Sequence, residues 1–487
     1  MAKAAGEHNQ VLTACLDELG WNPKVLARRI NKAFGTGTVA ESAPYHWRDA
    51  GRVPRQPLPA MAAYVLSQEL GRGVSVGELW QGRAADAPML VPADENLGQP
   101  WTREGLSRIV EDWVLSGLVD RRRFLAMSGA MLLASVSRYL SGTTGNGTSV
   151  PRLADEHLVD PLVTQVEQNL PLLQLLDDEH GGARHLPYVG AQFRSVGLLL
   201  HGGGHSNEVT ARMTRALAEI GQLAGWMAFD SADHGLAQRY FVTALHAAHQ
   251  VNDRALCAHI LADMSFQAAS RQYPSDAVEL GEAARRVSES ATSTVRASVL
   301  SRLAHGYAAA GRFDDFERAS GQARELIEAG GGGSGEEPRW MYFLTPNHLE
   351  CQAGYSLINL GRSMVRDGAK VPGCRHVRRG EALLESGAYA VGKGDPSQRR
   401  ALFEGAWLAM GYNVSGDLER ACEIGRKATA RLDNVRSPRS VELLRELAVD
   451  LRHKQKNPYV HSFLPELEHR LSMYASSLSG GRTTVAL

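Results

Sequence analysis

Hydrophobic residues recur at helical spacing from the start of the chain. Between residues 8 and 19, apolar side chains stand at positions i, i+1, i+4, i+5 and i+8, which predicts one helix. The same spacing returns from Pro23 to about Phe34, where Leu26 and Ile30 share a face. Strand-like alternation is sparse and aromatic residues make up only 7% of the chain, so we expect an all-helical fold.

The segment 22–47 has the order of two helices joined by a turn. Asn22 is a suitable N-cap for the first helix, and the turn at 35–38 contains two glycines. Ser42 then gives a second start signal. This is the order of a helix-turn-helix, in which the second helix places its first side chains in the major groove of DNA.

Positive charge is concentrated in the same part of the chain. From Lys24 to Arg55 there are seven Lys or Arg residues against two acids, a local charge of about +5, whereas the whole chain has 53 basic and 53 acidic residues. We expect base contacts from Tyr45, His46 and Arg48. We expect phosphate contacts from Lys24, Arg28, Arg52 and Arg55. We assign Leu26, Ile30, Phe34 and Trp47 to the core. The alternative is a helix pair whose charges only keep it soluble.

Composition divides the chain into five parts. They are a helix-turn-helix domain at 1–82, a linker at 83–100, a helical connector at 101–150, helical repeats at 151–475 and a tail at 476–487. The apolar stretch 124–140 is broken by serines and Arg138 and is shorter than the ~20 apolar residues of a spanning helix. It predicts a buried or dimer-forming helix, with no membrane partner. The chain opens without the apolar region of a signal peptide, and its five cysteines are scattered, which suits the cytoplasm.

From about residue 155 onward, pairs of helical segments recur with turn signals between them. Small or apolar anchors at Ala237, Ala277, Phe316 and Ala421 are 40, 39 and 105 residues apart. Tetratricopeptide repeats run at about 34 residues, so this spacing predicts an elongated version, with one unit enlarged by an insertion. We expect that insertion at 330–338 together with 362–380.

Stacked helical pairs form a concave surface that can hold a peptide, a helix of another protein or a small ligand. Polar and aromatic residues on the first helices are the candidates to line it. They are Arg239, Tyr240, His259, Gln267, Arg302, His305, Asn347 and Asn359. For any one of them the alternative is a solvated or core position.

Four residues of zinc-ligand type raise the question of a metal. They are His348, Cys351, Cys374 and His376, of which the second pair is expected in a turn. Their spacing matches no usual zinc finger, so metal-free thiols are the expectation and no cofactor is predicted. The chain also lacks the GxSxG and HExxH motifs and has no nucleophile with an evident base, so we expect no enzyme.

The stretches LGWNPKVLARRIN, SAPYHW and VSVGELW carry a resemblance to a known family. They resemble the N-terminal domain of actinobacterial regulators that join a repressor-like helix-turn-helix to a C-terminal region of tetratricopeptide-like repeats. The likeness is strongest over residues 18–82 and only architectural beyond about residue 155. It implies a repressor of sporulation or antibiotic-production genes. One departure is the segment between the two helices, which is longer than the turn of the simplest repressors.

Together these patterns predict a sequence-specific regulator that binds double-stranded DNA as a homodimer. The dimer would form through 101–140 or through the repeats, and the repeats would receive a signal or partner. A second hypothesis is a protein-interaction scaffold in which the N-terminal helices and the repeats both bind proteins. A third combines the two, as a receptor whose ligand opens or closes the dimer.

Overall fold

The structure is a computed structural model of the 487-residue chain. It describes residues 8–34, 38–55, 58–70, 74, 76–80, 99–115, 136, 139–140, 156–329, 337–385 and 397–480. These residues contain helices and no strand, which confirms the all-helical fold for this part of the chain. None of the helices in these ranges is long and apolar enough to cross a membrane. The chain divides into two compact units, residues 1–147 with 234–243 and residues 148–233 with 244–487.

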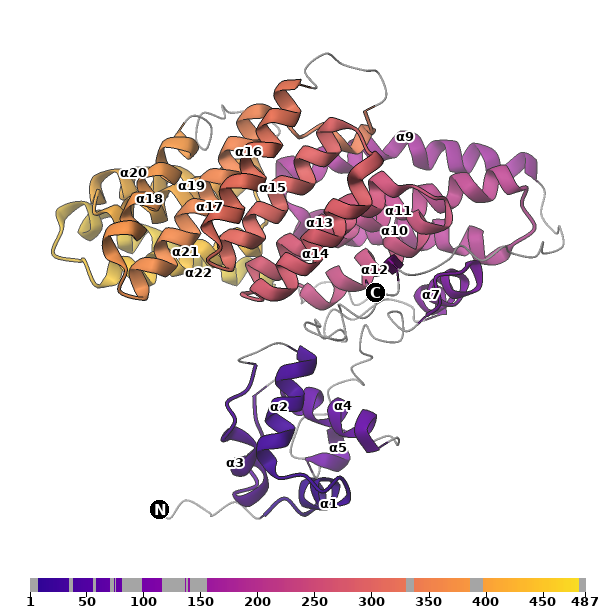
Figure 1. The fold of residues 1–487 in the computed structure, drawn as a ribbon, viewed down its shortest axis with the longest axis horizontal. Helices are drawn as coiled ribbons and strands as arrows, with labels where there is room; N and C mark the ends of the chain where they lie inside the picture. The colour runs from indigo at the N-terminus through magenta and orange to yellow at the C-terminus, as the bar shows by residue number, and fades with distance from the viewer. Residues whose placement is uncertain are drawn as a thin grey trace. The chain divides into compact units, whose positions relative to one another are not determined.

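The first five helices enclose one hydrophobic core (Figure 1). They are α1 (Gln10–Glu18), α2 (Pro23–Phe34), α3 (Ala43–Asp49), α4 (Leu58–Leu70) and α5 (Val76–Leu79). Leu26 and Ile30 are fully buried in this core, and Trp47 packs edge-on against Trp80 with 5.9 Å between their ring centroids. These residues occupy the core positions expected of them, whereas the side chain of Phe34 lies outside the described residues.

Asparagine side chains fix the ends of these helices. The Asn9 Oδ1 accepts a hydrogen bond from Leu12 N at 2.9 Å, and its Nδ2 donates to Leu79 O at 3.0 Å, which joins α1 to α5. Asn31 makes two bonds with the backbone of Val39, at 2.8 and 2.9 Å. Because Val39 comes just before α3, these bonds hold the longer connection against α2 at the point where it approaches the next helix.

Helix α7 (Arg103–Leu115) packs against the first part of α12 (His234–Gln250). The Trp113 indole Nε1 donates to Thr243 Oγ1 at 3.0 Å, and its ring stacks on Tyr240 at 4.5 Å. Arg239 lies over the same indole, 4.2 Å from the ring centroid, and pairs with Asp112. Arg239 and Tyr240 therefore face α7 and not a ligand groove, because α7 offers them an aromatic face and a carboxylate. Most of the segment 124–140 lies outside the described residues.

The larger unit is built from helices that follow one another as antiparallel neighbours (Figure 1). Its first helices along the chain are α9 (Glu156–His180), α10 (Gly182–Gly202) and α11 (Asn207–Asp230). Five hairpins follow: α13 (Arg254–Ser270) with α14 (Pro274–Val287), α15 (Ser293–Ala309) with α16 (Phe313–Ala329), α17 (Pro346–Arg366) with α18 (Lys370–Glu385), α19 (Gln398–Ser415) with α20 (Leu418–Ala430), and α21 (Pro438–Arg452) with α22 (Pro458–Gly480). Short 3-10 helices lie at η1 (Ser288–Ser290), η2 (Arg339–Met341) and η3 (Arg431–Asp433).

Turns between these helices use residues in the left-handed region. Gly311 and Gly416 have φ of 71° and 93° after α15 and α19, where glycine carries no steric cost. Asn252 and Gln272 adopt φ of 53° and 62° at the equivalent places after α12 and α13. The next helix then begins at once, and Asp253 caps α13 by accepting from Leu256 N at 2.9 Å. These short turns keep successive helices antiparallel and in contact.

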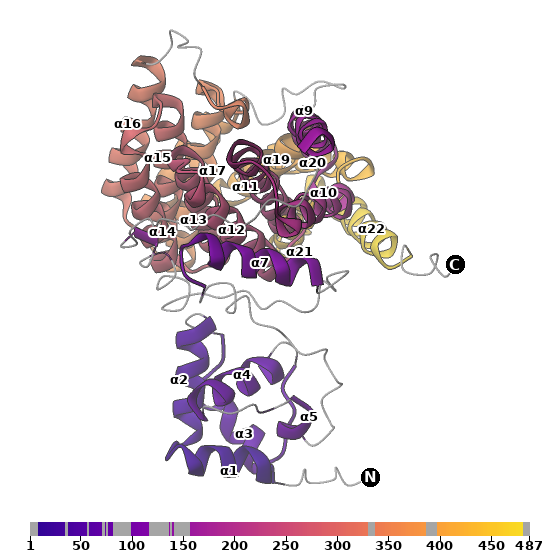
Figure 2. The same ribbon diagram turned by 90° about the vertical axis from the view of Figure 1, so that its right-hand side faces the viewer.

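The first helices of the hairpins form an arc that closes on itself. Helix α13 contacts α11 and α15, α17 contacts α15 and α19, and α19 contacts α21. Helix α21 in turn contacts α11, and α9 contacts both α11 and α19. Figure 2 shows α9 on the opposite side of this arc from α16. The surface expected as an open concave groove is therefore covered by α9 and by chain from the other end of the unit.

The insertion was expected at 330–338 together with 362–380; most of the first stretch lies outside the described residues, and the expectation for the second is wrong. These residues form the end of α17, a turn at Gly368 and most of α18. Glycines seven residues apart line the contact between the two helices, Gly354 and Gly361 on α17 and Gly373 and Gly380 on α18. A Cβ built on Gly361 would lie 2.5 Å from Gly373 O, and one on Gly380 would lie 2.5 Å from Gly354 O. The glycines that resemble a loop in sequence are thus the surface along which two helices approach closely.

Candidate functional site

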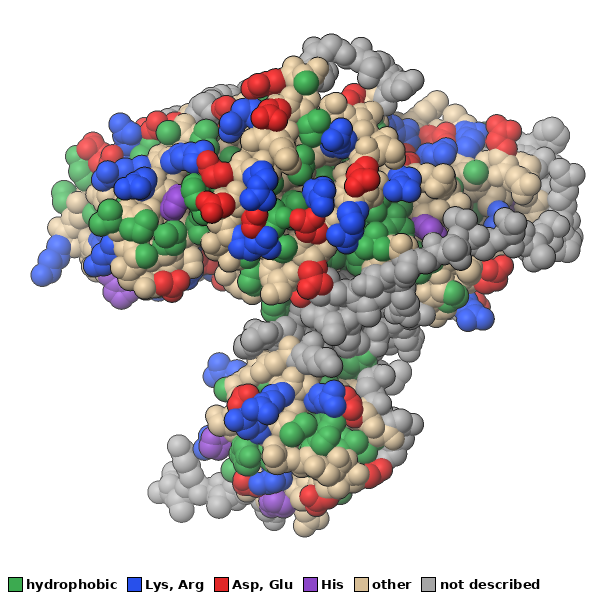
Figure 3. Space-filling view, viewed as in Figure 1, with side chains coloured by type: hydrophobic (Ala, Val, Ile, Leu, Met, Phe, Trp, Pro, Cys, Tyr) green, Lys and Arg blue, Asp and Glu red, His purple; other side chains and the backbone are tan. Residues whose placement is uncertain are grey.

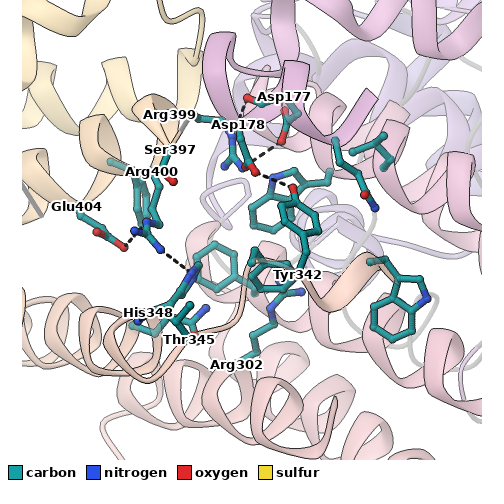
Figure 4. Close-up of a pocket in the computed structure, with 18 of the residues that line it drawn as sticks. Asp177, Asp178, Arg302, Tyr342, Thr345, His348, Ser397, Arg399, Arg400 and Glu404 are labelled. Carbon is teal, nitrogen blue, oxygen red and sulfur yellow. Dashed lines mark hydrogen bonds and ion pairs between the residues drawn. The ribbon is translucent and has the colours of Figure 1, made fainter. Parts of the chain in front are cut away.

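A cavity of about 400 Å³ lies at the centre of the arc (Figure 4). Its walls come from α9, α11, α13, α15, α17, α19 and α21, and from the segment 339–345 that precedes α17. The aromatic residues that line it are Trp226, Phe266, Trp340, Tyr342, Phe343, Tyr355 and Phe403. The arginines that line it are Arg302, Arg399, Arg400 and Arg439. A cavity of this size, with apolar walls and a few polar groups, has the features of a small-molecule site.

The segment 339–345 lies across the cavity and is tied down at both sides. The Arg339 guanidinium makes two bonds to the Glu219 carboxylate of α11, at 2.9 and 3.1 Å, and one to Glu167 O of α9 at 3.1 Å. The Tyr342 hydroxyl donates to Asp178 Oδ2 of α9 at 2.6 Å. Tyr342 and Leu175 both line the cavity and are 53% and 42% exposed. These two side chains therefore mark the opening of the cavity to solvent.

Arg399 is paired with two aspartates of α9. Its Nη2 lies 3.0 Å from Asp177 Oδ2 and 2.8 Å from Asp178 Oδ1, and its Nε donates to Asp177 O at 3.2 Å. Burial raises the pKa of Asp177 to about 7, although Arg399 opposes that rise. The contact joins the start of α19 to α9, as the dashed lines of Figure 4 show.

Two further arginines have a buried aspartate each. Arg302 pairs with Asp263, which also accepts from Gln222 Nε2 at 2.7 Å. Arg439 donates from Nε and Nη2 to Asp230 Oδ1, at 3.2 Å in both cases, and lies over Phe403 with 4.2 Å to the ring centroid. These pairs neutralise the two guanidinium groups inside the protein, where an unpaired charge would be costly.

Arg400 is different, because no carboxylate oxygen of the described residues lies within hydrogen-bond distance of it. Its nearest carboxylate oxygen is Glu404 Oε1, 3.8 Å from Nε, and its Nη1 lies 3.1 Å from His348 Nδ1. Burial and the neighbouring Arg400 lower the pKa of His348 to about 3, so the imidazole is neutral and its Nδ1 accepts from Arg400. Burial raises the pKa of Glu404 to about 7. Arg400 Nε and Glu404 Oε2 both lack a hydrogen-bond partner.

Stability should fall as the pH rises, in part because of Glu404. Its pKa rises from 4.5 to about 7 on folding, so between these values the folded state holds a proton that the unfolded state has lost. The free energy of unfolding then decreases with pH, by at most about 1.4 kcal/mol per pH unit for one group. The substitution Glu404→Gln should make the decrease in the free energy of unfolding between about pH 5 and pH 8 smaller, by on the order of 2 kcal/mol. Urea unfolding at several pH values measures this difference.

Glu423→Gln is the matched control for this pH experiment. Glu423 lies on α20, is 57% exposed and pairs with Lys427, whose hydrogen bond lowers its pKa. Its substitution should leave the decrease in the free energy of unfolding between these pH values unchanged. Asp177 remains in both variants and titrates in the same direction, so some pH dependence should persist. Equal falls in the wild type and in Glu404→Gln would contradict the prediction.

Some of the residues expected to line a groove do lie at this cavity. His259 and Arg302 are in its wall, and His259 stacks on Trp340 at 4.7 Å. Gln267 and His305 are buried, and His305 contacts the wall residue Phe266 at 4.7 Å. The residues that line the cavity do not include Asn347, Asn359, Arg239 or Tyr240.

Sequence reasoning missed the polar residues at the two ends of the unit. These are Asp177, Asp178, Arg399, Arg400, Glu404 and Arg439. The adjacent acids Asp177–Asp178 and the adjacent arginines Arg399–Arg400 were a local signal of complementary charge. Asp178 and Arg399 are 221 residues apart in the chain, so no local sequence pattern indicates that they pair.

The four residues considered as zinc ligands are not brought together. His348 and Cys351 lie in the first turns of α17, where burial and Glu404 raise the pKa of the Cys351 thiol. Cys374 and His376 lie in α18 and not in a turn. They follow Gly373, which packs against Gly361 of α17. Ten residues of helix separate Cys351 from Gly361, about 15 Å at the helical rise. No group of three metal-ligand side chains occurs among the described residues.

The N-terminal residues expected to contact DNA lie on or near the surface of α2 and α3. His46 is exposed, Tyr45 is half-buried, and Arg48 pairs with Asp49 at 2.7 Å. Lys24 and Arg28 both pair with Glu41, at 2.7 and 2.9 Å, and their hydrogen bonds lower the pKa of that carboxylate. The side chains of Arg52 and Arg55 are exposed. Figure 3 shows Lys and Arg side chains on these helices with Asp and Glu between them.

Comparison with known proteins concerns the same N-terminal helices. None of the curated proteins matches the chain. A family model described as the SP15 N-terminal domain matches residues 12–79. The match begins in α1 and ends with α5, so it spans the helices that share the N-terminal core. Over these residues the chain is similar to the SP15 N-terminal domain.

Proposed function

We propose that the chain is a DNA-binding transcriptional regulator whose C-terminal helices receive a small-molecule signal. In this proposal α2 and α3 are the two helices of a helix-turn-helix, and the hairpins from α13 to α22 are an elongated tetratricopeptide-like array. The regulator would act as a repressor of developmental or antibiotic genes, as the sequence resemblance implies. The central cavity favours a receptor over a scaffold, because it is closed by α9 and sized for a small ligand.

The observation that carries the proposal is the division of side chains on α3. Pro44 and Trp47 are buried against the core, while Tyr45, His46 and Arg48 reach the surface. A recognition helix needs this division, because its inner face must be fixed by packing before its outer face can read bases. Arg48 also lies over the Tyr45 ring at 5.5 Å, which supports its guanidinium at the surface.

The cationic side chains around α3 suit the DNA backbone. Arg52 and Arg55 are exposed, and Lys24 and Arg28 share the single carboxylate of Glu41. These two ion pairs are at the surface, where solvent screens them, so a phosphate can replace Glu41 at small cost. One such domain reads few base pairs, so the protein should bind two half-sites as a homodimer. Sedimentation of a monomer at micromolar concentration, both free and on DNA, would contradict this.

Two substitutions should affect DNA binding differently. Arg48→Ala should remove a base contact, which costs about 1–3 kcal/mol on the preferred sequence and relaxes the preference at that position. Lys24→Ala should remove a phosphate contact, which weakens binding to all sequences about equally and reduces the salt dependence. The preferred sequence is selected first from a pool of random duplexes, and gel shifts at two salt concentrations then compare the variants.

Arg108→Ala on α7 is the control for this comparison. Arg108 is exposed and lies outside the N-terminal core, so its loss should not change DNA affinity. If neither Arg48→Ala nor Lys24→Ala alters DNA binding, the DNA-binding proposal fails. The N-terminal helices would then have to bind another protein, as in the scaffold hypothesis.

A further inference from the structure

Among the arginines that line the cavity, Arg400 has the most distant carboxylate partner. Arg399 and Arg439 each have aspartate oxygens within 3.2 Å, and Arg302 has Asp263. The carboxylate nearest to Arg400 is 3.8 Å away on Glu404, and burial raises the pKa of Glu404 to about 7, so about half of it is protonated near pH 7. An arginine whose nearest carboxylate lies beyond hydrogen-bond distance has parallel N–H groups that can bind the carboxylate of a ligand.

Glu404 and His348 prepare this end of the cavity for an anion. Arg400 Nε and Glu404 Oε2 are buried and have no hydrogen-bond partner, whereas the Arg400 side chain as a whole is 24% exposed, so a ligand carboxylate would meet the outer N–H groups of the guanidinium. His348 holds Arg400 in place, because its Nδ1 accepts from Nη1 at 3.1 Å (Figure 4). The Cys351 side chain also makes a hydrogen bond with Glu404. At the other end, Asp177 Oδ2 and Asp178 Oδ1 pair with Arg399 and Asp178 Oδ2 accepts from Tyr342, whereas Asp177 Oδ1 has no hydrogen-bond partner.

Aromatic rings line the same cavity as Arg400 and limit the shape of the ligand. Phe343 lies 5.5 Å from the ring of His348, and Tyr355 meets Phe403 edge-on at 5.3 Å. Trp226 and Phe266, 6.0 Å apart, continue this wall toward α11 and α13. Rings of this kind pack well against a flat conjugated body. The cavity of about 400 Å³ admits a small molecule and excludes a folded partner.

We propose that the cavity binds a small aromatic carboxylate, with its carboxylate on Arg400 and its ring between the aromatic walls. This inference deepens the proposed function, because it names the class of signal that the regulator would receive. It is tested on the full-length protein without DNA, so its failure and the failure of DNA binding are separate results.

The test uses benzoate, 2-naphthoate, indole-3-acetate and biphenyl-4-carboxylate, each compared with its neutral primary amide. Isothermal titration calorimetry measures binding to the wild type, Arg400→Gln and Arg400→Lys. At least one of the acids should bind the wild type about 10-fold or more tightly than its amide. Arg400→Gln should remove this preference, and Arg400→Lys should keep part of it because it retains the charge but not the planar fork.

Arg445→Gln is the matched control, since Arg445 is an exposed arginine of α21 paired with Glu442 outside the cavity. It should bind the acids as the wild type does, and thermal melts should show that all variants are folded. The proposal is overturned if no acid binds, if acid and amide bind equally, or if Arg400→Gln keeps the preference. Binding of 4-(aminomethyl)biphenyl in place of the acids, or of a phenylalanine-terminated peptide alone, would also overturn it.

Discussion

Replacing Asp230→Ala is expected to lower the free energy of unfolding by about 3–5 kcal/mol. Asp230 is fully buried at the end of α11 and accepts hydrogen bonds from Arg439 and from Ser437 Oγ, the latter at 2.8 Å. Its Oδ2 also accepts from Gly182 N at 3.3 Å. Alanine would leave the buried guanidinium of Arg439 without a partner charge and Gly182 N without its acceptor. Urea unfolding measures the loss.

Glu442→Ala provides the comparison, because it breaks an ion pair on the same helix as Arg439. Glu442 is 64% exposed and lies 3.1 Å from Arg445, so its loss should cost at most about 0.5 kcal/mol. A double variant, Asp230→Ala with Arg439→Met, should recover part of the stability because no charge remains buried alone. If Asp230→Ala unfolds as readily as Glu442→Ala, the closure of the arc does not depend on this pair.

Gly361→Ala is expected to destabilise the protein by about 3 kcal/mol. A Cβ at this position would lie 2.5 Å from Gly373 O and 2.9 Å from Val377 N. These two obstacles are backbone atoms, and Val377 Cγ2 lies 2.7 Å away as well, so α17 and α18 would have to move apart. That movement would also loosen the contact between Gly354 and Gly380 one heptad away. Thermal and urea unfolding should both show the loss.

Gly321→Ala is the matched control for the glycine contact. Gly321 lies within α16, and a Cβ there would meet nothing within 4 Å. Alanine is favoured over glycine inside a helix by about 0.8–1.0 kcal/mol, so this variant should be more stable than the wild type. The same substitution thus has opposite signs at the two positions. A stabilising Gly361→Ala would mean that the two helices do not approach as closely as described.

The helices were predictable from the sequence where the hydrophobic periodicity agrees with the capping and turn residues. Pairs of helical segments separated by turn signals were expected beyond about residue 155, and α15 and α16 are such a pair, with Gly311 between them. Asn22 was expected as a cap, and its Oδ1 accepts from Val25 N at 3.1 Å. The misassigned stretch, 362–380, contains glycines that usually end helices. Here they permit close packing, which depends on a partner helix that the local sequence does not reveal.

The cavity was only partly predictable, for a different reason. His259 and Arg302 could be proposed because they lie on the inner helices of adjacent hairpins, where stacking alone exposes a concave face. Arg399 and Asp178 meet only because the arc closes, and this closure is a property of the whole unit. Arg239 was misplaced because its preferred partner, Trp113, lies 126 positions earlier in the chain.

The closed arc decides how this protein can be dissected. In an open array of repeats, terminal hairpins can often be removed while the rest stays folded, since each repeat contacts only its neighbours. Here Arg439 of α21 pairs with Asp230 of α11, and Arg399 of α19 pairs with Asp178 of α9. A fragment that stops before α21 would expose Asp230 and open the cavity. Ligand searches, crystallisation and domain exchange should therefore keep residues 156–480 as a single piece.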